Sequence, residues 1–411
     1  MANHSKKDVE LSAERQALLH RQLITIDEPG TILKDFNLFL TFIGSDGTPV
    51  SGKHDLLPNK TLLLLNEQLS TPYDIHFKRP RQSSYPNLNG LYLLARGSGL
   101  TRIGDMDGHS HLLLNETVYE QWQTLNPTEQ YFILFEAWLF HSPLEIIGPH
   151  SDIWNKAAVA AWRWFFQRMP EEGMQIAGNT DARNQLRYTP KWHNLALLEL
   201  FGLVLIKPAP PIDGAGWQIE HIRPSQLGLA LHDLMINYFN QNIDTILRQE
   251  SPTDMPMGCL QVIVQPYFPE WKTILALPEV KFKAGTYTFK VSQGWTWRRV
   301  QLSARMTLEM LSDVILTAFD FDNDHIYYFT YTDDAGRRRE VRHPDFDDGP
   351  WVSDIRIGDV PFKEGKAITF RYDLGRRWEF NIVLESIGPT DLYLTTPEIL
   401  EIQGNAPEQY P

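Results

Sequence analysis

Residues 286–321 read TYTFKVSQGWTWRRVQLSARMTLEMLSDVILTAFDF, and this stretch decides the fold of the C-terminal part. Apolar and polar residues alternate in TYTFKVSQ and WTWRRVQLSA, which predicts two strands between Thr286 and Ala304. From Thr307 to Phe321 the apolar residues recur at helical spacing, and Thr307 is the expected N-cap. Strands that lead into one long helix are typical of an α+β domain.

The segments that follow add further strands. IYYFTYTD, RRREVRH and AITFRYDLGRRWEFNIVLESI have the composition of strands, and the last of these is expected to be a hairpin. In the first, Tyr327 and Phe329 should share one strand face and Tyr328 the other. We therefore expect residues 276–411 to form an α+β domain with a mostly antiparallel sheet and one long helix.

The N-terminal part has a different pattern, mainly helical. A helix over Tyr85–Leu100 is followed by TRIGDMDGHSHLLLN, which reads as two short strands around a turn. The order helix, strand, turn, strand recurs from Lys191, with PAPPIDGAG as the second turn. This order is typical of winged-helix modules. We predict a multidomain α+β protein, with winged-helix-like units in domains 1–150 and 151–275.

Composition narrows the class of protein. The 411 residues carry a formal net charge of −13, which disfavours non-specific binding to nucleic acid. No apolar run is long enough for a membrane span, and the polar N-terminus lacks a secretory core, so the expectation is a cytoplasmic protein.

The single cysteine, Cys259, excludes an intrachain disulfide and a thiolate zinc cluster. Its alternating surroundings, MGCLQVIVQPY, favour a buried thiol on a strand over a nucleophile.

The segment FDNDHIYYF, Phe321–Phe329, concentrates candidate functional groups. Asp322, Asp324 and His325 lie there, and Asp373 could join them from the later hairpin. Metal binding or catalysis is one interpretation, because carboxylates and imidazole are suitable ligands. The structural alternative is a helix end whose carboxylates pair with arginines. The candidate arginines are Arg298, Arg299, Arg376 and Arg377.

The third interpretation of this region is a ligand-binding surface, and it is the source of our candidate site. That surface consists of Trp297, Arg298, Asp322, Asp324, His325, Asp373 and Trp378. We assign no catalytic residue, cofactor or metal, because the chain has no HExxH, CxxC, EF-hand, GxSxG, P-loop or GxGxxG motif.

A basic stretch, FKRPRQSSY, is the best candidate for contact with nucleic acid. It supplies Lys78, Arg79 and Arg81, and the following helix adds Arg96. In a winged-helix module these cations would contact phosphates. The alternative is an ordinary solvated basic loop.

Three stretches carry a resemblance to a known family: WRRVQL, FDNDHIYYF and YDLGRRWEFNIVLE. In order and spacing they resemble the plasmid pRiA4b ORF-3-like family over Thr286–Ile387, preceded by a long uncharacterised N-terminal extension. The resemblance implies no established biochemical activity, and some members are labelled as passengers of mobile elements. Arg376 and Phe380 stand where the family commonly has Asp and His, so part of any Asp/His centre is absent.

These observations favour a non-enzymatic binding or adaptor protein, whose partner is an unknown protein or small ligand and not a membrane. The first alternative is a DNA-associated regulator linked to mobile elements, with weak DNA binding. The second is a metal-dependent enzyme at the C-terminal Asp/His cluster.

Overall fold

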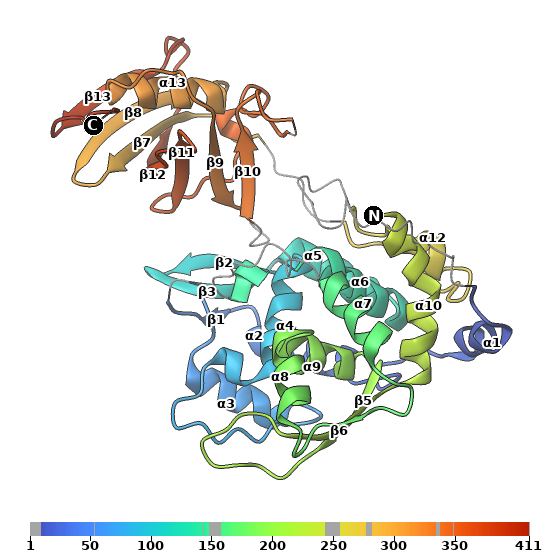
Figure 1. Cartoon of the computed structure of the whole chain (residues 1–411). Helices are drawn as coiled ribbons and strands as arrows, with labels where there is room; N and C mark the ends of the chain where they lie inside the picture. The colour runs from blue at the N-terminus through green and yellow to red at the C-terminus, as the bar shows by residue number, and fades with distance from the viewer. Residues whose placement is uncertain are drawn as a thin grey trace. The chain divides into compact units, whose positions relative to one another are not determined.

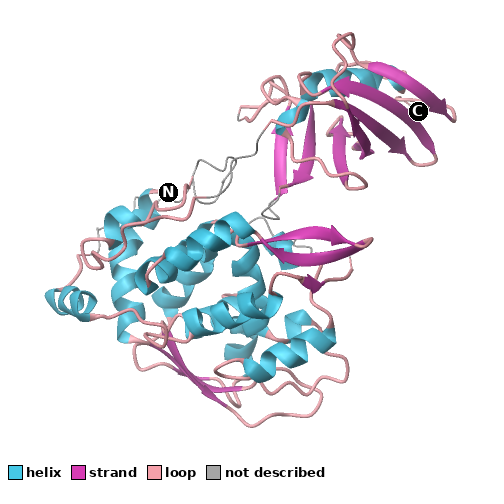
Figure 2. Ribbon diagram, turned by 180° about the vertical axis from the view of Figure 1, so that it is seen from behind, coloured by secondary structure: helices cyan, strands magenta, loops and turns pink. Residues whose placement is uncertain are grey.

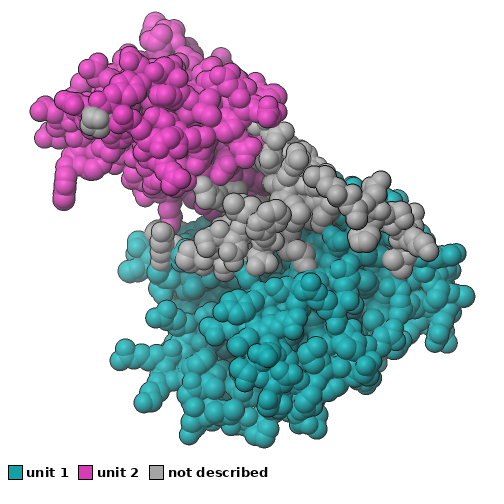
Figure 3. All heavy atoms as spheres, in the orientation of Figure 1, with its two compact units in different colours: residues 1–277, 335–337 teal, residues 278–334, 338–411 magenta. Residues whose placement is uncertain are grey.

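The computed structural model describes residues 10–52, 54–142, 144–147, 158–242, 255–276, 282–333, 338–347 and 349–410. The chain divides into two compact units, residues 1–277 and residues 278–334 with 338–411 (Figure 3). Each unit has its own hydrophobic core. The further division of the first unit near residue 150 stays a prediction.

The first unit is mainly helical, with two small three-stranded antiparallel sheets (Figure 1). Its helices are α1 Ala13–Arg21, α2 Ile32–Ile43, α3 Asn59–Gln68, α4 Pro86–Gly97, α5 Glu116–Thr124, α6 Pro127–Phe140, α7 Ala158–Arg168, α8 Thr180–Tyr188, α9 Trp192–Leu200, α10 Gln226–Gln241 and the short α12 Gln261–Val264. Its strands are β1 Thr48–Pro49, β2 Thr101–Met106, β3 His109–Leu114, β4 Met174–Gln175, β5 Val204–Pro208 and β6 Ile219–Pro224.

The first unit contains the same order of elements twice, first as α2-β1-α3-α4-β2-β3 and then as α7-β4-α8-α9-β5-β6. The sheet orders also correspond, β1-β3-β2 and β4-β6-β5. In both copies a glycine with φ of 73°, Gly99 or Gly202, separates the third helix from the next strand. The leucine after each glycine accepts a 2.9 Å backbone hydrogen bond from the residue that follows the hairpin, Asn115 or Ser225. The predicted recurrence of helix, strand, turn and strand is therefore confirmed.

The third helices of the two copies, α4 and α9, pack against each other in the interior. Every residue from Pro86 to Gly97 in α4 is buried. A Cβ atom built on Gly90 would lie 2.8 Å from Leu197 Cγ, so glycine permits the close approach of the two helices. Trp138 of α6 donates a 2.9 Å hydrogen bond from Nε1 to Asn194 Oδ1 of α9, which ties a third helix to this pair.

Residues 255–276 are held on α5 and α6 by side chains that bind backbone amides. The Glu136 carboxylate accepts hydrogen bonds from Gly258 N at 2.6 Å and Leu260 N at 2.5 Å. Glu129 accepts from Lys272 N at 3.2 Å and Thr273 N at 2.8 Å. These bonds satisfy amides that belong to no helix or strand ladder.

The predicted strand around Cys259 is wrong. Cys259 lies in a turn that leads into α12. The amides on either side of it, Gly258 N and Leu260 N, donate to the Glu136 carboxylate and are therefore not free to pair with a strand. The thiol is partly buried, and burial raises its pKa above the ordinary value, which disfavours the nucleophilic thiolate.

The second unit is a seven-stranded antiparallel sheet with one long helix, α13 Leu308–Ala318 (Figures 1 and 2). Its strands are β7 Thr286–Gln293, β8 Thr296–Ser303, β9 Tyr327–Thr332, β10 Arg338–Arg342, β11 Ala367–Tyr372, β12 Trp378–Gly388 and β13 Glu398–Gln403, in the order β10-β9-β11-β12-β7-β8-β13. This confirms the expected α+β class. Thr307 caps α13 through a 3.3 Å bond from Met310 N to its side chain, as predicted.

Burial alternates along the strands and defines two faces of the sheet. Arg298, Val300 and Leu302 of β8 point into the core, where α13 packs, while the residues between them lie on the opposite face. Tyr327 and Phe329 are buried and Tyr328 is half-buried, which confirms the predicted division of β9. Within the described residues, no helix has the length and apolar character needed to cross a membrane.

Candidate functional site

The loop after α13 brings together most of the predicted site. Phe321 N donates a 3.0 Å bond to Leu316 O, and Asp320 adopts a left-handed conformation with φ of 57°, which ends the helix and turns the chain. Residues 322–325 then run toward the start of β9 and meet the end of β11. Two distant parts of the chain, the β11–β12 turn and the C-terminal segment, complete the site.

Tyr372 at the end of β11 fixes the loop. Its hydroxyl donates to the Asp322 backbone oxygen and lies 2.9 Å from Asp324 Oδ1, and it accepts a 3.1 Å bond from Asp324 N. One side chain thereby holds both the backbone and the carboxylate of the FDND turn. Burial raises the pKa of Tyr372, so the hydroxyl remains protonated as a donor.

The C-terminal segment adds Gln409 and Tyr410. Asp322 N donates a 2.6 Å bond to Gln409 Oε1, and the Tyr410 hydroxyl lies 2.8 Å from Asp324 Oδ2 and 3.0 Å from Oδ1. The hydrogen bond from Tyr410 is the main cause that lowers the pKa of Asp324. The same bond raises the pKa of Tyr410 to about 12. Asp324 is therefore a carboxylate at neutral pH.

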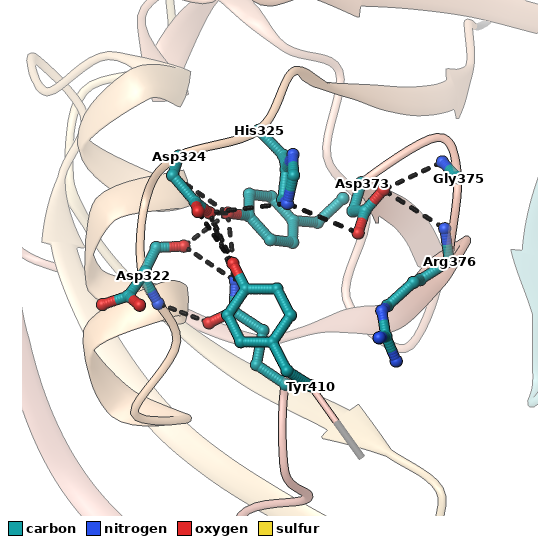
Figure 4. Close-up of polar contacts among 9 residues, drawn as sticks. Asp322, Asp324, His325, Asp373, Gly375, Arg376 and Tyr410 are labelled. Atoms are coloured by element: carbon teal, nitrogen blue, oxygen red, sulfur yellow. Dashed lines mark hydrogen bonds and ion pairs between the residues drawn. The ribbon is translucent and has the colours of Figure 1, made fainter.

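Asp373 lies in the turn between β11 and β12, on the other side of His325. Its Oδ1 accepts bonds from Gly375 N at 2.9 Å and Arg376 N at 3.2 Å, and Asp373 itself has φ of 53° (Figure 4). Its Oδ2 points to His325 Nε2 at 3.6 Å, while Asp324 Oδ1 lies 3.7 Å from the same nitrogen. The side chains of Asp324, His325 and Asp373 are 52%, 39% and 10% exposed. We call these three residues the Asp–His–Asp cluster.

The carboxylates of the cluster can accept hydrogen bonds from a ligand. Both carboxylates converge on one imidazole from distances beyond hydrogen-bond reach, so neither is fully committed to it. Arg376 lies with Cζ 5.6 Å from the Tyr410 ring centroid and closes one side of the site. Groups that donate several hydrogen bonds, such as an ammonium or a guanidinium, match this arrangement.

The geometry of these side chains does not match the interpretation of this segment as a metal site. The Asp322 carboxylate points away from the cluster (Figure 4). Asp324 is bonded by two tyrosine hydroxyls instead of standing free as a ligand. In the part of the chain that the structure describes, no three His, Cys, Asp or Glu side chains are placed to hold a metal ion.

Among the residues that the structure describes, none of these acids forms an ion pair with Arg298, Arg299, Arg376 or Arg377. Arg298 is buried and donates from Nε to Ala318 O at 2.6 Å, so it binds the end of α13 and not the carboxylates beyond it. Arg299 pairs with Glu385 at 2.6 Å and with Glu401. The hydroxyls of Tyr372 and Tyr410 take the role that we had given to arginine.

The predicted ligand surface is therefore not assembled as one surface. Asp324, His325 and Asp373 come together, with Asp322 beside them through its backbone. Trp378 packs on Phe321, with ring centroids 5.0 Å apart. Trp297 lies on the opposite face of the sheet from the buried Arg298, and Lys290 Nζ lies 4.7 Å from its ring centroid.

The predicted nucleic-acid residues are also divided. Lys78, Arg79 and Arg81 are exposed in one loop. Arg96 is 6% exposed inside α4 and donates a 3.3 Å bond to the Tyr92 hydroxyl, so its assignment as a phosphate contact is corrected. A helix that is buried on every side cannot enter a groove of DNA.

Sequence reasoning missed Tyr372, Gln409 and Tyr410. Tyr372 directly precedes Asp373 and lies on the same buried face of β11 as Phe370. This alternation predicts that Tyr372 is buried, but it does not predict which residues the Tyr372 hydroxyl binds. The segment NAPEQY, 405–410, gives no periodicity that would indicate where it returns.

The fold of the second unit is that of an α+β domain, and a family match covers the same region. Residues 288–409 match the family described as Plasmid pRiA4b ORF-3-like protein, which confirms the resemblance for the C-terminal part and leaves the N-terminal region outside it. The chain is also similar to a crystal structure of a protein of unknown function from Methanosarcina mazei Go1. The identity is 23% over 31% of this chain and 74% of that chain, with a TM-score of 0.28. No curated protein matches the chain.

Proposed function

We propose that this protein is a non-enzymatic binding protein, and that its C-terminal unit holds a cationic side chain of a protein partner at the Asp–His–Asp cluster. One observation carries the proposal. Asp324 Oδ1 and Asp373 Oδ2 lie 3.7 Å and 3.6 Å from the same nitrogen of His325, so two carboxylates flank one imidazole ring that is partly exposed. A lysine or arginine that entered there would gain charge-assisted hydrogen bonds.

The surroundings of the carboxylates favour binding over proton transfer. The pKa of Asp324 is lowered, chiefly by the Tyr410 hydrogen bond, so at neutral pH it stays charged. A general acid or base works best with a pKa near the working pH, which this group lacks. A fixed negative charge is instead well suited to a cationic ligand.

The architecture of the site favours recognition by a preorganised surface. Asp324 is fixed by Tyr372 and Tyr410, and Asp373 by the amides of its own turn. Little side-chain entropy is lost when such acceptors bind, which reduces the free-energy cost of association. The exposed Asp324 and Tyr410 place the cluster at a surface that a partner side chain reaches.

The test is calorimetric titration of the full chain with a tri-arginine peptide at low salt. Asp324→Asn should weaken binding roughly threefold to tenfold, as expected for a partly exposed charge pair. Glu364→Gln is the matched control, because it removes one negative charge from an exposed position of the same unit. Equal weakening by both variants, or no binding by the wild type, contradicts the proposal.

A second candidate is a DNA-associated regulator linked to mobile elements, in which both repeats of the first unit are winged-helix-like. It is favoured by the exposed basic loop at Lys78, Arg79 and Arg81, close to the β5–β6 hairpin. His76 N donates to Ala215 O at 3.1 Å, and Gly214 N donates to His76 O at 3.0 Å. The loop thus lies beside the hairpin that corresponds to a wing.

DNA binding by this loop would be a backbone contact without base reading, because α4 and α9 are turned inward. Replacing Lys78, Arg79 and Arg81 by Ala should weaken binding to any duplex equally and reduce the salt slope by about 2 to 3. Fluorescence anisotropy with two unrelated duplexes measures both quantities. An unchanged salt slope eliminates this candidate.

A further inference from the structure

The two edges of the seven-stranded sheet differ in character. β10, at one edge, carries the charged residues Arg339, Glu340 and Arg342. β13 lies at the other edge (Figure 1), and all of its residues are exposed. Its apolar residues Ile399, Leu400 and Ile402 are 37%, 47% and 61% exposed. Charged side chains protect an open edge from pairing with another chain, whereas apolar ones promote such pairing.

More apolar surface lies next to β13. Trp295, in the β7–β8 turn, is fully exposed at 100%. Thr296 donates a 2.9 Å bond to Asn405 O, so the β7–β8 turn lies beside the end of β13. Large apolar side chains that gather around an open strand edge indicate an interaction surface.

A bulge in β13 determines which of its side chains share a face. Ile399 pairs with Val300 and Ile402 with Arg298, and both partners point into the core. The register shifts between Ile399 and Glu401, which leaves Leu400 as the extra residue. Ile399 and Ile402 therefore lie on the same face, although they are three positions apart. Glu398 and Gln403 lie on the opposite face, with Gln301 and Trp297.

We propose that β13 pairs antiparallel with β13 of a second copy of this chain, so that the two sheets continue into one another. The sequence EILEIQ is complementary to itself in one register. There Ile399 meets Ile402 of the other copy, Glu398 meets Gln403, and the bulged Leu400 meets Glu401. Directly opposed residues of an antiparallel pair share a face, and the bulge provides this condition for both pairs.

The neighbouring registers are less favourable. A shift of one residue in one direction sets Glu401 opposite Glu401 of the second copy, and a shift of two in the other sets Glu398 opposite Glu401. Like charges directly opposite each other destabilise a strand pair. The intermediate shift sets Ile399 opposite Glu401, which leaves the apolar side chains unmatched. Charge and apolar pattern thus favour the proposed register over these three neighbours, and the self-complementary pattern favours a second copy as the partner.

The first test is the oligomeric state of the full chain, measured by sedimentation equilibrium over a range of protein concentrations. We expect a reversible dimer whose dissociation constant rises at least about tenfold in Ile402→Lys. Val262→Lys is the matched control, because Val262 is 73% exposed in the first unit, and it should leave the dimer unchanged. A monomeric wild type, or a dimer equally stable in Ile402→Lys, overturns the proposal.

The second test addresses the register through a covalent link between the two copies. In a Cys259→Ser background, Ile399→Cys combined with Ile402→Cys should give a disulfide-linked dimer on mild oxidation. Directly opposed residues lie about 4.5–5.5 Å apart between Cα atoms, within the range that a disulfide spans. Each single cysteine variant should form far less linked dimer. Equal linking by the single and double variants contradicts the proposed register.

Discussion

Arg298 Nε donates a 2.6 Å hydrogen bond to the backbone oxygen of Ala318, the last residue of α13. Its Nη1 donates to Gln403 O at 3.0 Å, and the guanidinium lies 4.5 Å from the Phe319 ring centroid. One buried cation thereby joins the helix end, the strand β8 and the end of β13. It positions the loop that carries Asp324 and His325 of the Asp–His–Asp cluster, because that loop begins just after the helix end that Arg298 binds.

Arg298→Met should therefore destabilise the second unit. The variant keeps much of the apolar stem but leaves carbonyl oxygens at the helix end without their donor, which costs on the order of 2–3 kcal/mol. Urea denaturation followed by circular dichroism measures the change. Arg299→Met, on the opposite face of β8, is the control and should have a clearly smaller effect. Equal effects would show that Arg298 has no capping role.

Glu136 should make the stability of the first unit depend on pH. Burial raises its pKa to about 7 from the ordinary 4.5. A carboxyl with a raised folded-state pKa contributes fully below its unfolded pKa, and the contribution is lost as pH rises through the folded pKa. The free energy of unfolding of the wild type, relative to Glu136→Gln, should thus fall by about 3 kcal/mol between about pH 4 and pH 8. Parallel pH profiles for the two proteins would contradict this.

Tyr410→Phe should raise the pKa of Asp324 toward its ordinary value of 3.8, because the Tyr410 hydrogen bond is the main cause of the lowered value. A lowered folded-state pKa contributes stability above the unfolded pKa and loses it as pH falls, so the variant should also have a weaker acid dependence. NMR titration of the Asp324 carboxyl carbon measures the shift. Tyr393→Phe is the control, since Tyr393 is almost fully exposed. No shift in Tyr410→Phe would mean that the C-terminal segment does not dock in solution.

Gly90→Ala should destabilise the first unit, although alanine is the better helix former by about 1 kcal/mol. The new Cβ atom would lie 2.8 Å from Leu197 Cγ on α9. Leu197→Ala makes room for it, so the double variant should be more stable than the sum of the two single changes predicts. Thermal denaturation of the four proteins measures this coupling. Additive effects would argue against a close α4–α9 contact.

Local signals predicted local structure well. Thr307 marks the start of α13 because its side chain binds an amide three residues away, and that distance is visible in sequence. The convergence of His325 and Asp373 was also expected, since a helix end and a hairpin of one small domain have few places to meet.

The sequence did not predict which charged side chains are buried by contacts between elements far apart in the chain. Alternation in WTWRRV shows that Arg298 and Arg299 face opposite sides but not which of them is buried. The sequence predicts a phosphate contact for Arg96 because it lies on the helix that would be the recognition helix of a winged-helix unit. Its burial follows from the packing of α4 on α9, which only the tertiary structure reveals.

The most direct test of cation binding at the Asp–His–Asp cluster is a double-mutant cycle between protein and probe. Wild type and Asp324→Asn are each titrated with tri-arginine and with tri-citrulline, which keeps the shape of arginine without its charge. We expect Asp324→Asn to weaken tri-arginine binding at least about threefold and to leave tri-citrulline binding unchanged. The same ratio for both peptides would show that Asp324 does not contact the cationic group, and would contradict the proposed function.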